Sequence, residues 1–200
     1  KFSLDFRAPV SKVVVEGEPS YFKQEDTKLI IAPPTPITVG STFDVTVYYA
    51  GYINHIVDPD GSREGWVRAC RSGAPSPTNV NCFGSFTVSE PIGAESWFPN
   101  NNVPADKATF DTTTTVPDEI LPADDWTALG TGEFVSQVDN GASVTWKWQE
   151  VQPTSTYLTT GSVGRYSYVV DSITDAPNSA TCPVYNAYDR RPPPTQTTNI

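Results

Sequence analysis

Apolar and polar residues alternate with a period of two along several short segments of the chain. Successive side chains of a β-strand point to opposite faces, so this alternation predicts strands with one buried face. The β-branched and aromatic residues in these segments favour the same interpretation. The clearest examples are Lys12 to Glu16, Lys28 to Ala32, Thr42 to Ala50 and Ala142 to Glu150.

Helical patterning is weak by comparison. No stretch of about a dozen residues carries an apolar stripe of helical period with capping residues at its ends. The 19 prolines and 13 glycines also interrupt the chain too often for long helices. The sequence therefore predicts an all-β, antiparallel fold, either a β-sandwich or an open saddle.

One predicted strand carries a stripe of large apolar residues. In the segment SVTWKWQE, one face holds Val144, Trp146 and Trp148, and the residues between them are polar. We interpret this stripe as part of the core.

The length and composition of the chain indicate its organisation. The 200 residues are 38% hydrophobic and 12% aromatic, which is sufficient for one substantial core with room for a small second lobe. We predict a single β-domain over residues 1–174. From Asp175 onward the chain is rich in Pro, Asn and Thr and finishes in RRPPPTQTTNI. This composition predicts a Pro-rich linker or tail over residues 175–200.

The charge of the chain restricts the partners that it can bind. A formal net charge of −10 and a pI near 4.4 oppose binding to nucleic acid or to an anionic membrane, since both need a basic surface. No run approaches the roughly 18 apolar residues of a membrane-spanning helix. No signal peptide precedes the strand-like segment at Lys1. We expect a secreted or extracytoplasmic protein from which a targeting segment has been removed.

The three cysteines allow two interpretations. Cys70 and Cys82 flank RSGAPSPTNVN, which is typical of a hairpin loop, and a disulfide between them would suit an oxidising compartment. Alternatively, all three are reduced thiols of a cytosolic protein. Cys182 would be free or would pair with another chain.

The chain lacks the residues for the common hydrolytic sites. A zinc peptidase of the H-E-x-x-H type needs two histidines on one helix, and this chain has a single histidine, His55. No G-x-S-x-G nucleophile motif is present either. The sequence therefore predicts no catalytic residue and no metal site in this chain.

Two acidic segments invite a calcium interpretation. Asp58 to Gly65, DPDGSREG, lacks the ligand spacing of an EF-hand, and its Pro59-Asp60-Gly61 is sufficient to make a turn without an ion. The adjacent acids Asp124 and Asp125 are typical of a solvated loop. We interpret both segments as turns.

The most specific pattern lies between Thr87 and Phe110, in TVSEPIGAESWFPNNNVPADKATF. It resembles the aminopeptidase N and leukotriene hydrolase family of zinc aminopeptidases. The N-terminal β-domain of that family carries a Gln or Glu, seven further residues, Phe-Pro-Cys, and then Asp-x-Pro-x-x-Lys-Ala-x-Phe. The matching positions here are Glu90, Phe98, Pro99, Pro104, Lys107, Ala108 and Phe110.

Two further segments extend the resemblance. PTSTYLTTGSVGRY, from Pro153 to Tyr166, is similar to the family's Pro-Met-x-Thr-Tyr-Leu strand and its Gly-x-Tyr ending, and FSLDF near the start resembles an early strand. The chain also departs from the pattern, because it has Asn100 for the motif's Cys, Asn102 for its Asp and Thr154 for its Met.

The resemblance implies a non-catalytic domain that caps the active-site cleft of a zinc aminopeptidase. The opening strands would be missing before Lys1, and the zinc-bearing catalytic domain of the same polypeptide would follow the linker. At the position of Glu90 the family places a side chain that holds the free α-ammonium group of the peptide. The alternative for Glu90 is an ordinary exposed loop glutamate.

A second interpretation belongs to a different class of protein. The chain could be a freestanding secreted module that kept the fold but lost the peptidase. Its five tryptophans would then serve as a surface for binding a ligand or polymer. The length of the encoding reading frame separates the two interpretations.

Overall fold

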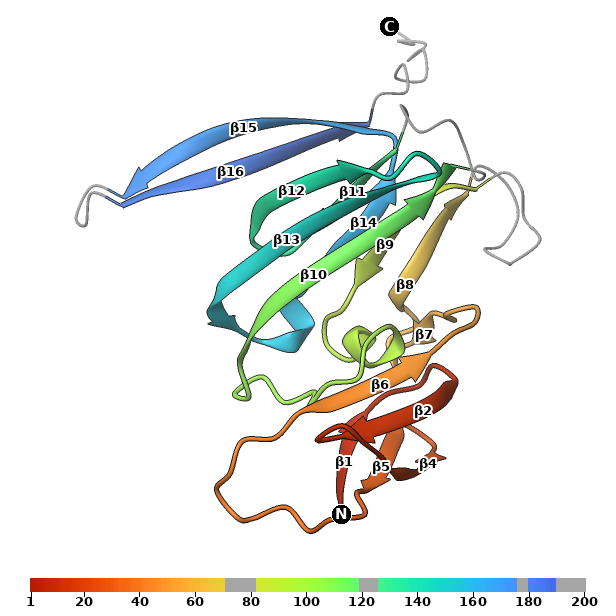
Figure 1. Ribbon diagram of the computed structural model, residues 1–200. Coiled ribbons are helices and arrows are strands. Elements are labelled where there is room, and N and C mark those ends of the chain that lie inside the picture. The colour runs from red at the N-terminus through yellow and green to blue at the C-terminus, as the bar shows by residue number, and fades with distance from the viewer. Residues whose placement is uncertain (71–81, 119–125, 176–179, 190–200) are drawn as a thin grey trace, which may run out of the picture. The chain divides into compact units, whose positions relative to one another are not determined.

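The computed structural model describes residues 1–70, 82–118, 126–175 and 180–189 (Figure 1). These residues form antiparallel strands and two short 3-10 turns, so the predicted all-β class is confirmed. The turns are η1 (Gly93–Ser96) and η4 (Thr156–Leu158). The strands are β1 (Phe2–Asp5), β2 (Val10–Val15), β3 (Glu18–Pro19), β4 (Tyr21–Glu25), β5 (Lys28–Ala32), β6 (Val45–Tyr49), β7 (Ile56–Val57), β8 (Arg63–Cys70), β9 (Cys82–Val88), β10 (Ala108–Pro117), β11 (Thr127–Gly130), β12 (Glu133–Asp139), β13 (Ser143–Thr154), β14 (Gly161–Gly164), β15 (Tyr166–Asp175) and β16 (Ala180–Asp189).

The chain divides into two compact units. The first comprises residues 1–109 and 151–160, and the second comprises residues 110–150 together with the chain from residue 161 onward. The β-domain predicted over residues 1–174 therefore contains parts of both units.

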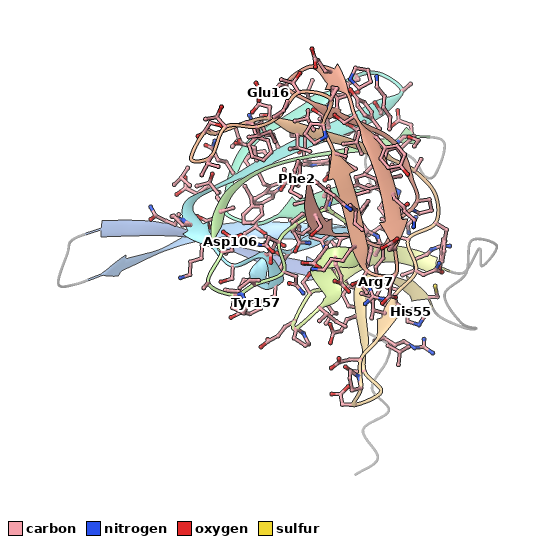
Figure 2. All side chains as sticks on the ribbon, turned by 90° about the horizontal axis from the view of Figure 1, so that it is seen from below. Phe2, Arg7, Glu16, His55, Asp106 and Tyr157 are labelled. Atoms are coloured by element: carbon pink, nitrogen blue, oxygen red, sulfur yellow. The ribbon has the colours of Figure 1, made fainter. Side chains whose placement is uncertain are left out.

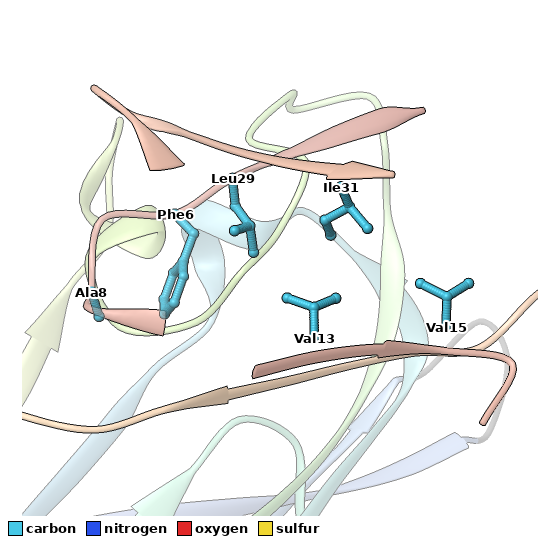
Figure 3. Close-up of a cluster of buried hydrophobic side chains, with 6 residues drawn as sticks. All are labelled: Phe6, Ala8, Val13, Val15, Leu29 and Ile31. Carbon is cyan, nitrogen blue, oxygen red and sulfur yellow. The ribbon is translucent and has the colours of Figure 1, made fainter. Parts of the chain in front are cut away.

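The first unit begins with two small antiparallel sheets, ordered β1-β5-β4 and β3-β2-β6. Figure 3 shows the aliphatic cluster between them: Leu29 and Ile31 of β5 point toward Val13 and Val15 of β2. All four side chains are at most 3% exposed. The alternation that predicted strands at Lys12 to Glu16 and Lys28 to Ala32 therefore arises from this core.

The same unit contains a second set of strands, β7, β8 and β9. They pair in antiparallel fashion, with Ile56 opposite Glu64 and Gly65 opposite Val88. β8 and β9 form the hairpin that was predicted around residues 71–81, which themselves lie outside the described residues. The η1 turn follows β9 directly.

The second unit is built around tryptophan. Its sheet β10-β13-β12 buries Val144, Trp146 and Trp148, which are at most 5% exposed, so the predicted stripe is confirmed as core. The Trp148 indole Nε1 donates a hydrogen bond of 2.9 Å to the Ala128 carbonyl oxygen of β11. β11 in turn pairs with β14.

A long hairpin occupies part of the predicted tail. β15 pairs with β16 from Tyr166 opposite Asp189 to Asp175 opposite Ala180. Residues 180–189 are therefore a strand rather than the linker or tail that the Pro-, Asn- and Thr-rich composition predicted, because backbone pairing with β15 satisfies them. Residues 190–200 lie outside the described residues.

Within the ranges that the structure describes, no helix has both the length and the apolar character needed to cross a membrane.

Candidate functional site

Glu90 lies in the short connection between the end of β9 and the η1 turn. Glu90 and the following Pro91 are exposed, whereas Ser89 before them is 6% exposed and all four residues of η1 after them are buried. The Glu90-Pro91 peptide bond is cis. An exposed carboxylate therefore stands on a segment whose two flanks are fixed in the interior of the first unit.

Two glycines allow the η1 turn to lie directly against β8 and β9. A Cβ atom at Gly93 would overlap the Val88 carbonyl oxygen and come within 2.6 Å of the Gly65 nitrogen. Gly65 has φ of +91°, and a Cβ there would overlap the Ser96 hydroxyl. Backbone thus packs against backbone at this point, which no larger residue permits.

A buried carboxylate holds the start of the turn. Glu64 on β8 is 1% exposed, and its Oε2 accepts a hydrogen bond of 3.0 Å from the Ile92 backbone N–H. Burial raises the pKa of Glu64, and the negative charges of Asp58 and Asp60 act in the same direction, while the N–H groups of Ile92 and Gly93 oppose the shift.

An ion pair holds the other end of the turn. The Arg7 Nε donates to Glu95 Oε1 at 2.5 Å, and the Arg7 backbone N–H donates to the Glu95 carbonyl oxygen at 2.9 Å. Burial raises the pKa of the Glu95 carboxyl, and the Arg7 guanidinium partly offsets that rise. The two residues are 88 positions apart in sequence.

Aromatic side chains pack behind Glu90. Trp97 makes edge-to-face contacts with Trp66 and Phe98, with ring centroids 5.7 Å and 4.5 Å apart. Its indole Nε1 donates to the Ser89 hydroxyl at 3.3 Å, and the Tyr49 hydroxyl donates to its backbone carbonyl at 2.7 Å. These rings therefore anchor the loop in the unit.

The asparagine that replaces the motif's aspartate links the separated motif segments. The Asn102 Nδ2 donates to the Pro91 carbonyl oxygen at 3.2 Å, and its Oδ1 accepts a hydrogen bond of 3.4 Å from the Thr156 hydroxyl. The Asn102 backbone N–H donates to Asp5 Oδ2 at 3.0 Å, and Asp5 pairs with Lys28. FSLDF, the Asn-rich loop and PTSTYL thus meet next to Glu90.

Glu90 itself makes no hydrogen bond or ion pair with any residue in the described ranges. Its carboxylate is therefore not neutralised by a described Lys or Arg. The contacts of its neighbours could not be found from the sequence, because Arg7, Glu64 and Asp5 carry no motif that indicates a role at this turn.

The other sequence candidates lie elsewhere. Asp58 to Ser62 form a turn in which the Gly61 N–H donates to the Asp58 carbonyl oxygen at 2.8 Å. No group of three or more His, Cys, Asp or Glu side chains in the described ranges could hold a metal ion, so these residues do not fit a zinc site. The two acids at 124 and 125 lie outside the described residues.

The structure describes only one of the two cysteines of the predicted disulfide in full. Cys70 is disulfide-bonded, and Cys70 and Cys82 face each other in the register of β8 and β9. The side chain of Cys82 is not among the described ones, so the pairing stays a prediction.

The five tryptophans do not form an exposed platform. Trp146 and Trp148 are buried, and Trp66, Trp97 and Trp126 are partly buried. Binding of a flat ligand or polymer needs aromatic faces that are open to solvent. This arrangement disfavours the tryptophan-based binding module.

No family model and no curated protein sequence matches the chain. Solved structures do match it. A two-domain M1 zinc metallopeptidase bound to L-arginine has a TM-score of 0.77 and 25% identity, over 98% of this chain and 41% of that one. The M1 zinc metallopeptidase from Deinococcus radiodurans matches with a TM-score of 0.77 and 24% identity, again over 98% of this chain and 41% of that one. Legionella pneumophila aminopeptidase A, in complex with aspartic acid, matches with a TM-score of 0.66 and 15% identity, over 92% of this chain and 19% of that one.

The extent of the match is itself informative. The chain spans 41% of the length of the first two structures, although nearly all of it is matched. The matched region therefore forms only one part of those enzymes. Over nearly its whole length, the chain resembles the N-terminal β-domain of the M1 zinc metallopeptidases, as its sequence motifs predicted.

Proposed function

We propose that this chain is the non-catalytic N-terminal domain of a zinc aminopeptidase. In that enzyme it caps the active-site cleft and helps to bind the free amino terminus of the peptide substrate. Its partner is the catalytic domain of the same polypeptide.

The observation that carries the proposal is the setting of Glu90. Its carboxylate is exposed and unpaired, whereas Ser89 and the η1 turn on either side are buried. A carboxylate without an internal cation partner is available for an α-ammonium group, and a fixed backbone reduces the entropy lost on binding. An internal peptide amide carries no positive charge, so such a contact selects amino termini.

The hydrolytic chemistry belongs to the separate catalytic domain. Zinc bound there would activate water to attack the first peptide bond. In this proposal the chain itself supplies neither the metal ligands nor the nucleophile. Its contribution is to position the amino terminus of the substrate.

We place the protein in a secreted or extracytoplasmic compartment. Cys70 is disulfide-bonded, and disulfides persist mainly in oxidising compartments. The net charge of −10 is compatible with this assignment and opposes binding to nucleic acid or to anionic membranes.

The proposal is tested in the full-length enzyme with Glu90→Ala. The substitution should lower kcat/KM for peptides with a free amino terminus, by the equivalent of about 2 to 4 kcal/mol if the ion pair is well desolvated. Glu90→Gln keeps a hydrogen-bond acceptor, so its kcat/KM should lie between the values of the parent and of Glu90→Ala. Thermal stability should change little, because Glu90 is exposed and makes no hydrogen bond or ion pair with the described residues.

Glu133→Ala is the matched control, since it removes another exposed carboxylate, from β12 in the second unit. Its kcat/KM should equal that of the parent. An unchanged kcat/KM in Glu90→Ala, with zinc content intact, would show that Glu90 does not hold the substrate.

A further inference from the structure

A cavity of about 450 Å³ lies in the first unit, and Arg7, which pairs with Glu95, is part of its lining. Its walls come from three places: the connection from β1 to β2, strand β7 with the segment that leads into it, and Ser96 of the η1 turn. Arg7 and His55, the single histidine of the chain, lie next to each other in Figure 2, and both line the cavity. A volume of this size is typical of sites for small molecules.

Arg7 supplies only hydrogen-bond donors to the lining, and the side chains of Tyr52, Asn54 and His55 can each donate as well. Arg7 uses its Nε and its backbone N–H on Glu95, and its two terminal amino groups make no hydrogen bond to the described residues. The side chains of Tyr52, Asn54 and His55 likewise have no partner among these residues. Among the residues that the structure describes, no Asp or Glu contributes to the lining. In a chain with a net charge of −10, a cavity lined by an arginine and by no described acidic side chain is unusual.

Hydrogen bonds with Gln24 of β4 fix the backbone that follows Arg7. The Gln24 Nε2 donates to the Ala8 carbonyl oxygen at 2.8 Å, and the Val10 N–H donates to Gln24 Oε1 at 3.1 Å. Arg7 therefore begins a backbone segment fixed by β4, and its guanidinium is oriented by Glu95. A guanidinium that is already oriented loses little entropy when it binds an anion.

The remaining lining is apolar. It includes Ile53, Ile56 and Ala8, of which Ile56 and Ala8 are at most 8% exposed. A ligand that satisfies both parts of the lining has one anionic group and a small apolar body. We propose that this cavity binds a small organic monocarboxylate, whose carboxylate contacts Arg7 and whose apolar body lies against the isoleucines. This inference does not depend on the role of Glu90.

Benzoate is a suitable probe, and benzamide is its uncharged counterpart of the same shape. Because the chain has one histidine, the imidazole signals of His55 are a unique reporter in ¹H–¹³C spectra at constant pH. Benzoate should shift these signals saturably, and benzamide should bind roughly tenfold more weakly. Inorganic phosphate, which lacks the apolar body, should also bind roughly tenfold more weakly.

Two substitutions in the 200-residue chain test the location. Asn54→Asp places a negative charge in an exposed wall residue that has no partner, so the fold should remain, and benzoate affinity should fall by roughly fivefold. Arg7→Lys keeps a charge beside Glu95 but removes the planar fork, and should weaken benzoate similarly. Gln137→Glu, on exposed β12, changes the net charge as Asn54→Asp does and should leave the affinity unchanged.

Three results would overturn the proposal. The first is the absence of a saturable shift at His55 with benzoate. The second is equal binding of benzoate, benzamide and phosphate, which would show that neither the charge nor the apolar body is recognised. The third is an equal loss of affinity in Asn54→Asp and Gln137→Glu, which would show that only the overall charge acts.

Discussion

The aliphatic cluster around Leu29 and the η1 turn beside Glu90 lie in the same unit but are stabilised in different ways. The cluster consists of branched aliphatic side chains together with Phe6 and Ala8, and it lies between two small sheets. The turn consists of a glycine packed on backbone, with buried Glu64 and Glu95 at its ends. Hydrophobic burial is non-directional, whereas hydrogen bonds and close backbone contacts act only at particular distances and angles.

The two kinds of contact have different consequences for the domain: the cluster supplies stability, and the contacts of the turn fix the backbone on either side of Glu90. A core of aliphatic residues supplies stability and tolerates changes of shape if its volume is kept. The η1 turn supplies little apolar burial, but its contacts fix the positions of Ser89 and Ile92. We therefore expect substitutions in the cluster to affect mainly stability. If Glu90 binds the amino terminus of the substrate, as proposed, substitutions at the turn should affect both stability and substrate binding.

The largest effect is expected for Gly93→Ala. The new methyl group would overlap the Val88 carbonyl and approach the Gly65 nitrogen, and neither backbone atom can move without separating η1 from β8 and β9. We expect a loss of about 4 kcal/mol in the free energy of unfolding, measured with urea. Gly40→Ala is the control, because a Cβ there has open space although φ is +82°, and its loss should be about 1 kcal/mol. Equal losses would mean that the close packing at Gly93 is unimportant.

A somewhat smaller effect is expected for Leu29→Ala in the aliphatic cluster. The side chain is fully buried, so truncation removes apolar burial and leaves a cavity, with a loss of about 3 kcal/mol. In the full-length enzyme kcat/KM should stay near the parent value under conditions where the variant is folded. Val39→Ala removes a fully exposed side chain and should change stability by less than about 0.5 kcal/mol. A large fall in kcat/KM for folded Leu29→Ala would remove the distinction between the two regions.

The aliphatic cluster could be predicted from sequence, and the turn could not. Alternation over Lys28 to Ala32 predicts β5 with the observed bounds, and the tryptophan stripe predicts the core of β13. These patterns are local, because the period of a strand is repeated within a few residues. The position of Glu90 next to its motif was also available from the sequence, through the family resemblance.

The framework of the turn depends on pairs that are distant in sequence. Arg7 reaches Glu95 across 88 residues, and Asn102 reaches Asp5 across 97. From the sequence alone, a single glutamate such as Glu64 would be predicted to be an exposed strand residue. Its burial follows only from the fold. Strand β16 illustrates the same limit, since its composition is that of a linker and its pairing with β15 is set by the fold.

A smaller effect is expected for Asn102→Ala, which removes the hydrogen bonds to Pro91 and Thr156. The loss in free energy of unfolding should be about 1 kcal/mol, because both bonds are partly accessible to water. If Glu90 binds the amino terminus, kcat/KM should also fall severalfold, since the Glu90-Pro91 segment loses a support. Asn101→Ala is the control, because the Asn101 side chain bonds Asp106 in an exposed loop. Equal kcat/KM in the two variants would show that Asn102 does not position Glu90.

The smallest effect concerns the pH dependence of stability and is tested with Glu64→Gln. Burial raises the pKa of Glu64 above its ordinary value of 4.5, so between these two values the folded protein binds more protons than the unfolded chain. The contribution of Glu64 to the free energy of unfolding is therefore fully present below pH 4.5 and is lost as the pH rises through the raised pKa. Glutamine resembles the protonated carboxyl and does not titrate. The stability of Glu64→Gln relative to the parent should consequently increase as the pH rises through this window and then level off. Urea unfolding across a pH series measures this difference, with Glu133→Gln on exposed β12 as the control. A difference that stays constant with pH would mean that Glu64 is not desolvated in the folded state, and that the turn is more open to water than the aliphatic cluster.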